Sequence, residues 1–215
     1  MNGLEHVVLF AVSLVANLFS AFSGGGAGLI QLPALIFLGL PFAIALATHK
    51  VASVALGIGA TVRHLKEGGL ERRLVTRILA FGLPGVVFGA NVILYVPERS
   101  AEVALGLLTA GLGIYSWLNP GLGQVVRQVN RDQRGVLIGG AVLFAIGALN
   151  GSLTSGTGLF VTLWLVRWFG LDYRRAIAYT LILVGVFWNG AGALTLGILG
   201  EIRWSWLPAC LLYTS

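Results

Sequence analysis

The sequence predicts an all-α polytopic membrane protein that contains an inverted repeat and two glycine-rich broken or re-entrant helices. Hydrophobic residues make up 57% of the 215 residues, charged residues make up only 10%, and the mean hydropathy is +0.89. A soluble domain carries about 25% charged residues, so this chain lacks the polar surface that water requires. The apolar residues form runs of helical length without the alternation of a β-barrel. Glycines interrupt two of these runs at matching positions.

The apolar runs, taken in order, predict membrane helices along the whole chain. They cover residues 4–22, 29–38, 42–62, 74–96, 101–118, 136–149, 159–169, 176–199 and 204–213. A helix needs about 20 apolar residues to cross a bilayer, so the longer runs are expected to span it. The last run stops where the sequence stops, and we therefore expect a chain that is truncated at its C-terminus.

Positive residues divide the loops into two groups. Eleven Lys and Arg lie in 63–77, 119–135 and 167–175, whereas only two lie in 95–101 and 197–205. Cytoplasmic loops carry an excess of Lys and Arg, so the first group is expected in the cytoplasm and the second outside. The net charge of +6 follows from this topology, and we expect no nucleic-acid partner.

The pair of runs 136–149 and 159–169 begins and ends at cytoplasmic loops. Its pieces of about 14 and 11 residues are each too short to span, so they predict a re-entrant hairpin with Ser155–Gly158 at its tip. The segment Leu4–Leu38 is the counterpart expected on the outer side, although its longer first arm leaves a kinked span open. Three full spans separate the two segments, and this odd number inverts the second copy.

Matching positions support the repeat. Gly28-Leu-Ile matches Gly158-Leu-Phe, and Gly39-Leu40 matches Gly170-Leu171; chance similarity between Gly- and Leu-rich segments is the alternative. Glycine interruptions in corresponding halves are typical of a transporter's binding site near the bilayer midplane. The chain thus divides into a first repeat, a cytoplasmic loop and a second repeat, over residues 1–118, 119–135 and 136–215.

Lys50 is the charged residue placed well inside a predicted span. It lies about eight residues into the run 42–62, on the order of 12 Å from that end. A charge there costs at least ~2.5–3.5 kcal/mol on insertion scales, so Lys50 is a candidate for anion binding or coupling. The structural alternative is that Lys50 caps the carbonyls of a broken helix. The adjacent His49 is either a proton-linked group or a buried hydrogen-bonding histidine.

The glycine breaks supply hydrogen-bond donors. A short helix begins after Gly28 and after Gly158, so free N–H groups and positive dipole ends face the breaks and attract anions. No Asp or Glu placed well inside a predicted span opposes this charge; glycines that serve only helix packing are the alternative. The predicted substrate is a small anion, and its candidate ligands are Ser23, Gly24, Gly25, Gly26, Gly28, Thr48, His49, Lys50, Ser155, Gly156, Thr157, Gly158, Thr180 and Asn189.

The sequence lacks the residues that are characteristic of a phosphate-binding loop, a metal site or an intramembrane hydrolase. No Gly-Lys-Ser/Thr follows Gly24–Gly28, the three His lack metal-ligand spacing, and no nucleophile–base pair for an intramembrane hydrolase is apparent. We therefore expect no catalytic residue, no metal, no cofactor and no enzyme activity. The expected partners are a small anionic substrate and the lipid bilayer, and homo-oligomerisation is left open.

Four motifs carry a family resemblance: Ser23–Leu35, Ala47-Thr-His-Lys50, Gly156-Thr-Gly158 with Gly170–Ala176, and Asn189-Gly190. With them the chain resembles the sulfite exporter TauE/SafE family of membrane transporters over nearly its whole length. The resemblance implies a multi-pass secondary transporter in the cell (inner) membrane that exports sulfite, thiosulfate or organosulfonates. An anion channel or a non-catalytic accessory subunit is the alternative.

Two departures from the family pattern concern the predicted site. Where relatives commonly have Thr-Asn-Lys, this chain has Thr48-His49-Lys50, and where the second half often has Thr-Lys, it has Thr180-Leu181. A site built from two symmetric lysines therefore does not apply here. We expect the two halves to contribute unequally to substrate binding.

Overall fold

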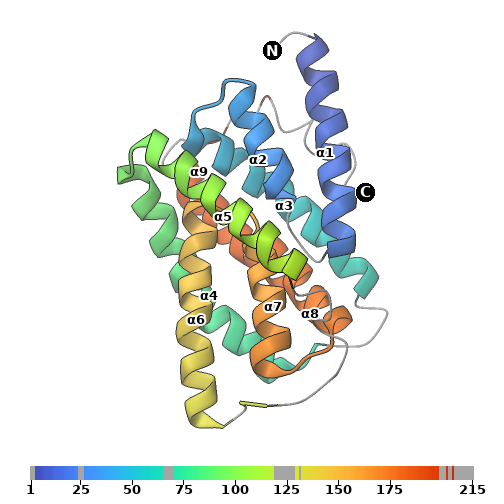
Figure 1. The fold of residues 1–215 in the computed structure, drawn as a ribbon, viewed down its shortest axis with the longest axis vertical. Helices are drawn as coiled ribbons and strands as arrows, with labels where there is room; N and C mark the ends of the chain where they lie inside the picture. Colours follow the sequence, from blue (N-terminus) through green and yellow to red (C-terminus); the bar gives the residue numbers. More distant parts are fainter. Residues whose placement is uncertain are drawn as a thin grey trace.

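The computed structural model is helical in every regular element that it describes (Figure 1). It describes residues 3–23, 27–64, 70–118, 129–130, 132–198, 202 and 205. The predicted all-α class is confirmed. The predicted ligands Gly24, Gly25 and Gly26 and, apart from Ser205, the last apolar run 204–213 lie outside the described residues.

The helices follow the predicted apolar runs to within a few residues, because an apolar run continues for as long as a helix faces lipid or the interior. The first half forms α1 (Gly3–Ser23), α2 (Gly28–Phe37), α3 (Phe42–His64), α4 (Arg72–Val92), the 3-10 turn η1 (Ile93–Tyr95) and α5 (Glu98–Leu118). The second half forms α6 (Gln133–Ser152), α7 (Thr157–Phe169), α8 (Tyr173–Tyr179), the π-helix η2 (Thr180–Trp188) and α9 (Asn189–Ile198).

Four segments are long and apolar enough to cross a bilayer. They are Phe42–Val62, Arg72–Tyr95, Gln133–Ser152 and Tyr173–Ile198, the last of which joins α8, η2 and α9. Their lengths of 20 to 26 residues correspond to about 30–39 Å at the helical rise, which matches or exceeds the hydrocarbon core of about 30 Å. The protein is therefore a multi-pass membrane protein.

The prediction that the run 136–149 is too short to span is wrong. Helix α6 has 20 residues, because it continues through the polar residues Asn150 and Ser152 at its end. Asn150 is buried, and the Ser152 hydroxyl donates to the carbonyl of Ala148 at 2.9 Å, so both polar groups have partners inside the helix bundle. Helix α7 has only 13 residues, as expected. Each hairpin thus pairs a long arm with a short one, since α1 has 21 residues and α2 has 10.

The two hairpins occupy different parts of the molecule. In Figure 1, α1 lies in the upper part of the view, whereas α6 and α7 fill the lower part and α7 runs back beside α6. The α6–α7 turn needs left-handed backbone, with φ of 58° at Thr154 and 70° at Gly156. Glycine accepts this conformation without steric cost, which accounts for Gly156 immediately before α7.

The long helices pack backbone to backbone through glycines. On α4, Gly85 and Gly89 face the main chain of Phe144 and Ala148 on α6, so that an added Cβ would collide with carbonyl oxygens. The crossing of α3 and η2 is equally close, because a Cβ on Gly57 would lie 2.7 Å from the carbonyl carbon of Gly185. Small residues allow such close approach of membrane helices.

Two clusters of buried hydrophobic side chains form the core. One contains Leu32 and Leu35 of α2, Ala45 and Leu46 of α3, and neighbours from α5 and η1. The other gathers side chains of α4, α6, α7, α8 and η2 around Trp188. Each cluster thus holds the short helix of one hairpin against the helix that follows it.

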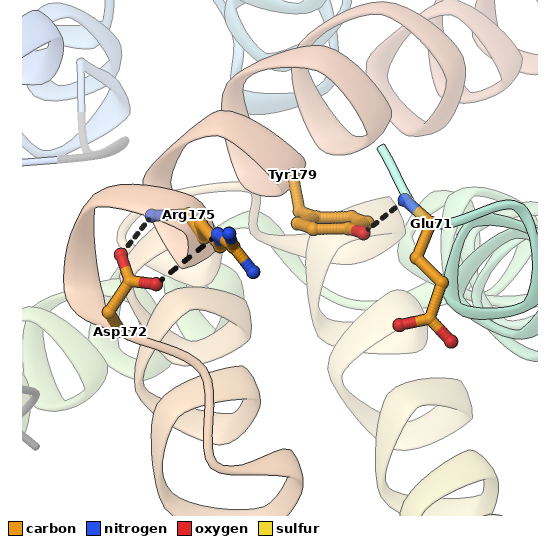
Figure 2. Close-up of polar contacts among 4 residues, drawn as sticks. All are labelled: Glu71, Asp172, Arg175 and Tyr179. Atoms are coloured by element: carbon orange, nitrogen blue, oxygen red, sulfur yellow. Dashed lines mark hydrogen bonds and ion pairs between the residues drawn. The ribbon is translucent and has the colours of Figure 1, made fainter. Parts of the chain in front are cut away.

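The start of α8 is fixed by its own polar residues (Figure 2). Oδ1 of Asp172 accepts a hydrogen bond from the backbone N–H of Arg175 at 2.8 Å, and Oδ2 pairs with the Arg175 guanidinium at 3.5 Å. At the other end of α8, the Tyr179 hydroxyl accepts from the backbone N–H of Glu71 at 2.6 Å. The motif Gly170–Ala176 therefore begins α8, and Tyr179 ties the end of this helix to the start of α4.

Candidate functional site

A cavity with polar and apolar walls lies where the two glycine breaks meet. A Cβ added to Gly28, at the start of α2, would lie 3.3 Å from Cα of Ser155 in the α6–α7 turn. The cavity beside this contact offers about 50 Å³ to the centres of water-sized molecules, and a single water needs about 10–15 Å³ on that measure. The space therefore accommodates several waters or a small anion.

Polar groups, bare backbone and four apolar residues line this cavity, and the apolar ones are Ala27, Leu56, Leu181 and Val184. Its hydroxyl, amide and imidazole side chains come from α1, α3, the α6–α7 hairpin, η2 and α9, and they are Ser20, His49, Ser53, Asn150, Thr154, Thr157, Thr180 and Asn189. Gly28, Gly57, Gly158 and Gly185 present main chain. Among the described lining residues there is no Asp or Glu, so the wall offers donors to an anion without an opposing carboxylate.

The structure brings together about half of the sequence-predicted ligands. Those that line the cavity are Gly28, His49, Thr157, Gly158, Thr180 and Asn189. Those that are buried close by in the chain but do not line it are Thr48, Lys50, Ser155 and Gly156. The side chain of Ser23 and the residues Gly24, Gly25 and Gly26 are outside the described part.

Lys50 lies behind the wall of the cavity. Its side chain is fully buried, and its Nζ donates to the carbonyl oxygen of Asn150 at 2.7 Å and lies 3.4 Å from the side-chain oxygen of the same residue. The stem passes Gly192 of α9, where an added Cβ would come within 2.9 Å of Cδ. Asn150 belongs to the last turn of α6, whose carbonyls lack helical partners. This contact has the geometry that the capping alternative describes.

Asn150 connects the elements around the cavity, and the sequence reasoning missed it. Its side-chain N–H₂ donates to Thr157 Oγ1 at 2.9 Å and to Asn189 Oδ1 at 3.3 Å. Its carbonyl accepts from Lys50 and, at 2.7 Å, from the Thr154 hydroxyl. One side chain thus joins α6, α7 and α9. The available signal was an isolated amide at the end of an apolar run, directly before the glycine break.

His49 belongs to a second hydrogen-bonded chain. Its Nδ1 lies 2.6 Å from Oε1 of Gln31, and Nε2 of Gln31 donates to Ser13 Oγ at 2.8 Å. Its Nε2 lies 3.2 Å from Ser53 Oγ. The chain joins α1, α2 and α3. Gln31 and Ser13 were not predicted as site residues, although each is a polar residue inside an apolar run.

The second half of the chain contains a hydrogen bond at the positions that correspond to the Gln31–His49 contact. The hydroxyl of Thr162 on α7 donates to that of Thr180 on η2 at 2.8 Å, and the two are 18 residues apart, like Gln31 and His49. Thr162 stands 131 positions after Gln31, and Thr180 stands 131 positions after His49. The same interval separates Gly39 from Gly170, and both of these glycines have positive φ. In this register Leu181 takes the place of Lys50. The shared register supports the predicted repeat.

Ser155 occupies the tip of the second hairpin. Its side chain is fully buried, and its Oγ has no hydrogen-bond partner in the described structure. It stands two residues before α7, whose N-terminus carries the positive end of the helix dipole, although the Thr157 N–H already donates to the Thr154 carbonyl at 3.2 Å. A buried donor next to a helix N-terminus is suited to an anion.

The family model described as "Sulfite exporter TauE/SafE" matches residues 9–215, which include every residue of the cavity wall. The chain belongs to this family. The TauE/SafE membership also confirms the resemblance carried by the glycine breaks and by the motif around Lys50. No solved structure matches the chain.

Curated relatives are named as membrane transporters. A "probable membrane transporter protein" of Haemophilus influenzae is 29% identical to this TauE/SafE chain, over 92% of the chain and 76% of the relative. The "probable membrane transporter protein YfcA" of Escherichia coli is 30% identical, over 92% of the chain and 72% of the relative. A third relative, "probable membrane transporter protein ORF9" of Sinorhizobium, is 27% identical over 80% of the chain and 65% of the relative.

Proposed function

We propose that this TauE/SafE protein is a secondary transporter that exports small anions, with sulfite, thiosulfate and organosulfonates as its substrate class. One observation carries the proposal: the two glycine breaks, far apart in sequence, meet at a cavity whose wall contains eight polar side chains. Inverted-repeat carriers bind their substrates between such broken helices. The family description and the names of the relatives support the same function.

The charge of the site favours an anion. Lys50 is the one charged side chain among the buried residues of the described chain, and no buried carboxylate accompanies it there. Helix α7 begins at the cavity wall with Thr157, so the positive end of its dipole faces the cavity. The hydroxyl and amide groups around it supply neutral donors. Such a wall fits the several acceptor oxygens of a sulfur oxyanion or sulfonate.

Export follows from the membrane potential. An inside-negative potential favours the exit of an anion by about 2.3 kcal/mol per charge per 100 mV. In alternating access, one half of the molecule rocks against the other around the fixed cavity. The backbone contact of α3 and η2 at Gly57 and Gly185 offers a surface without bulky side chains for such a movement.

Transport by the purified protein in liposomes tests the proposal. Internal unlabelled sulfite or thiosulfate is expected to accelerate uptake of labelled external anion, and the initial rate is expected to saturate with concentration. Flux that rises linearly and shows single-channel steps would instead identify an anion channel. Absence of flux for sulfite, thiosulfate, sulfonates and phosphate alike would point to an accessory subunit and refute the transporter.

A further inference from the structure

We infer that the cavity takes up a proton together with its anion, and that Nε2 of His49 binds this proton. The inference rests on the proposed anion transport and adds a second ligand to the same site. It follows from the hydrogen bonds around the imidazole, from the position of Nε2 in the wall and from the charges that surround it.

The orientation of the Gln31 amide in the structure makes Nε2 the basic nitrogen of His49. The amide nitrogen of Gln31 donates to Ser13 Oγ at 2.8 Å, which turns its oxygen toward Nδ1 of His49 at 2.6 Å. A carbonyl oxygen only accepts hydrogen bonds, so Nδ1 carries the hydrogen and donates it. Nε2 is therefore the nitrogen with a free lone pair. All three side chains are buried, so water does not compete for these bonds.

Nε2 faces the space that the anion occupies. His49 lines the cavity, and an added Cβ on Gly28 would come within 2.9 Å of Nε2. The neighbouring Ser53 hydroxyl, at 3.2 Å, donates to a neutral Nε2 or accepts from a protonated one after a simple rotation. The pocket therefore suits both protonation states without movement of the backbone.

The surrounding charges link the proton to the anion. Lys50, the next residue of α3, is the one charged side chain buried near His49 in the described structure, and its nitrogen points to Asn150. The described cavity-facing groups of α1, α2, α7, η2 and α9 include no acid. A proton on His49 therefore adds positive charge beside Lys50 that only an anion in the cavity can balance. Each ligand then favours the binding of the other, and this coupling is reciprocal.

Coupling changes the charge that moves across the membrane. A monovalent sulfonate together with one proton is electroneutral, so the membrane potential does not drive it. A divalent anion with one proton still carries one net negative charge, and the potential still favours its export. A pH gradient that is acidic outside opposes the outward movement of this proton in both cases, so export of a sulfonate then depends on its own concentration gradient.

Affinity at two pH values tests the inference. Methanesulfonate and thiosulfate are the probes, because both stay ionised at about pH 5.5 and about pH 8, so that only the protein changes its protonation between the two values. The wild-type protein is expected to bind them roughly tenfold more tightly at the lower pH, within the ~5–150-fold range of coupled sites. In His49→Asn, whose amide can still donate to Gln31, the ratio of the two affinities is expected to approach one.

A matched variant and a second measurement keep the result interpretable. His64→Asn makes the same change at the last residue of α3, about 22 Å from His49 along the helix, and should keep the wild-type ratio. If His49→Asn does not fold, calorimetry of the wild-type protein in two buffers of different ionisation enthalpy measures proton uptake directly, and close to one proton per anion is expected near neutral pH.

The outcomes separate this inference from the proposed function. Anion binding with equal affinity at both pH values and no proton uptake would overturn the proton site and leave anion transport intact. Retention of the pH dependence in His49→Asn would equally overturn it. If no probe anion binds or is transported, the proposed function fails, and the proton site fails with it.

Discussion

Lys50 and Asn150 connect the two halves of the protein through a single pair of residues. The ammonium nitrogen reaches a main-chain carbonyl in the last turn of α6, where free carbonyls give the helix end a partial negative charge. The side chain of Asn150 then reaches α7 and α9. A cationic Lys50 can therefore act on an anion in the cavity in two ways, through its charge and through the position of the hairpin.

Substitution of Lys50 distinguishes charge from position. Lys50→Gln removes the charge but keeps an N–H₂ group that can donate toward Asn150, so we expect normal membrane insertion and an anion flux in liposomes reduced by more than about tenfold, equivalent to about 1.4 kcal/mol. Arg73→Gln, on the exposed start of α4, also removes one positive charge and should leave the flux unchanged. Equal flux in both variants would contradict a central role for Lys50.

At the level of single residues, the sequence predicts only part of the candidate site. His49, Thr157, Thr180 and Asn189 reach the cavity as expected, because polar groups in apolar helices turn inward. The partners Gln31 and Asn150 could not be assigned, since Asn150 meets a residue 100 positions away and only the folded helices bring them together. Nor does spacing along α3 reveal that the ammonium of Lys50 lies behind the wall.

Helices α4 and α6 pack with parts of their backbones in direct contact, because glycines leave no side chain between them. The contact depends on Gly85 and Gly89 on one helix and on Gly147 and Gly151 on the other. In contrast, Gly106 on α5 is exposed, and a methyl group added to it would have no neighbouring atom within 4 Å. The same residue type therefore has opposite roles in two helices.

Alanine scanning of these glycines checks the packing. Gly89→Ala places a methyl group against the carbonyl of Ala148, so we expect a loss of about 1–3 kcal/mol of stability and a lower apparent melting temperature in detergent. Gly106→Ala meets open space and removes a flexible residue from a helix, which should raise stability by up to about 1 kcal/mol. Similar shifts in both variants would argue against a tight α4–α6 contact.

Helix positions were predictable because they depend on local composition. The prediction failed at α6, where the apolar run ends at Leu149 but the helix continues to Ser152. Polar residues end an apolar run, yet they continue a helix when the interior supplies their hydrogen bonds, as it does for Asn150. The π-helix Thr180–Trp188 was not foreseen either, since its sequence is uniformly apolar and gives no signal of a wider turn.

For the whole molecule, the asymmetry of positive charge predicts which ends face the cytoplasm. Ser100, near the start of α5, belongs to the side with few positive residues, whereas Arg174, at the start of α8, belongs to the arginine-rich side. Both residues are exposed in the structure. The two positions therefore report on opposite faces of the membrane.

Labelling with a membrane-impermeant maleimide tests this orientation. In a Cys210→Ser background, which removes the single cysteine, Ser100→Cys is expected to react in right-side-out vesicles. Arg174→Cys is expected to react only after permeabilisation, because positive loops are retained in the cytoplasm. The opposite pattern would reverse the topology and with it the expected direction of transport.

If α3 tilts during transport, its close crossing with η2 is the point about which it would turn. Gly57 touches Gly185 there, and it stands 15 residues from Phe42 at one end of α3 and seven from His64 at the other. At the helical rise, the parts of α3 on either side of Gly57 are about 22 Å and about 10 Å long. A tilt of α3 about this point would move its Phe42 end, which is predicted to lie outside, roughly twice as far as its His64 end, which is predicted to lie in the cytoplasm. Opening toward the outside would then be wide, and opening toward the cytoplasm narrow, for the same angle of rotation.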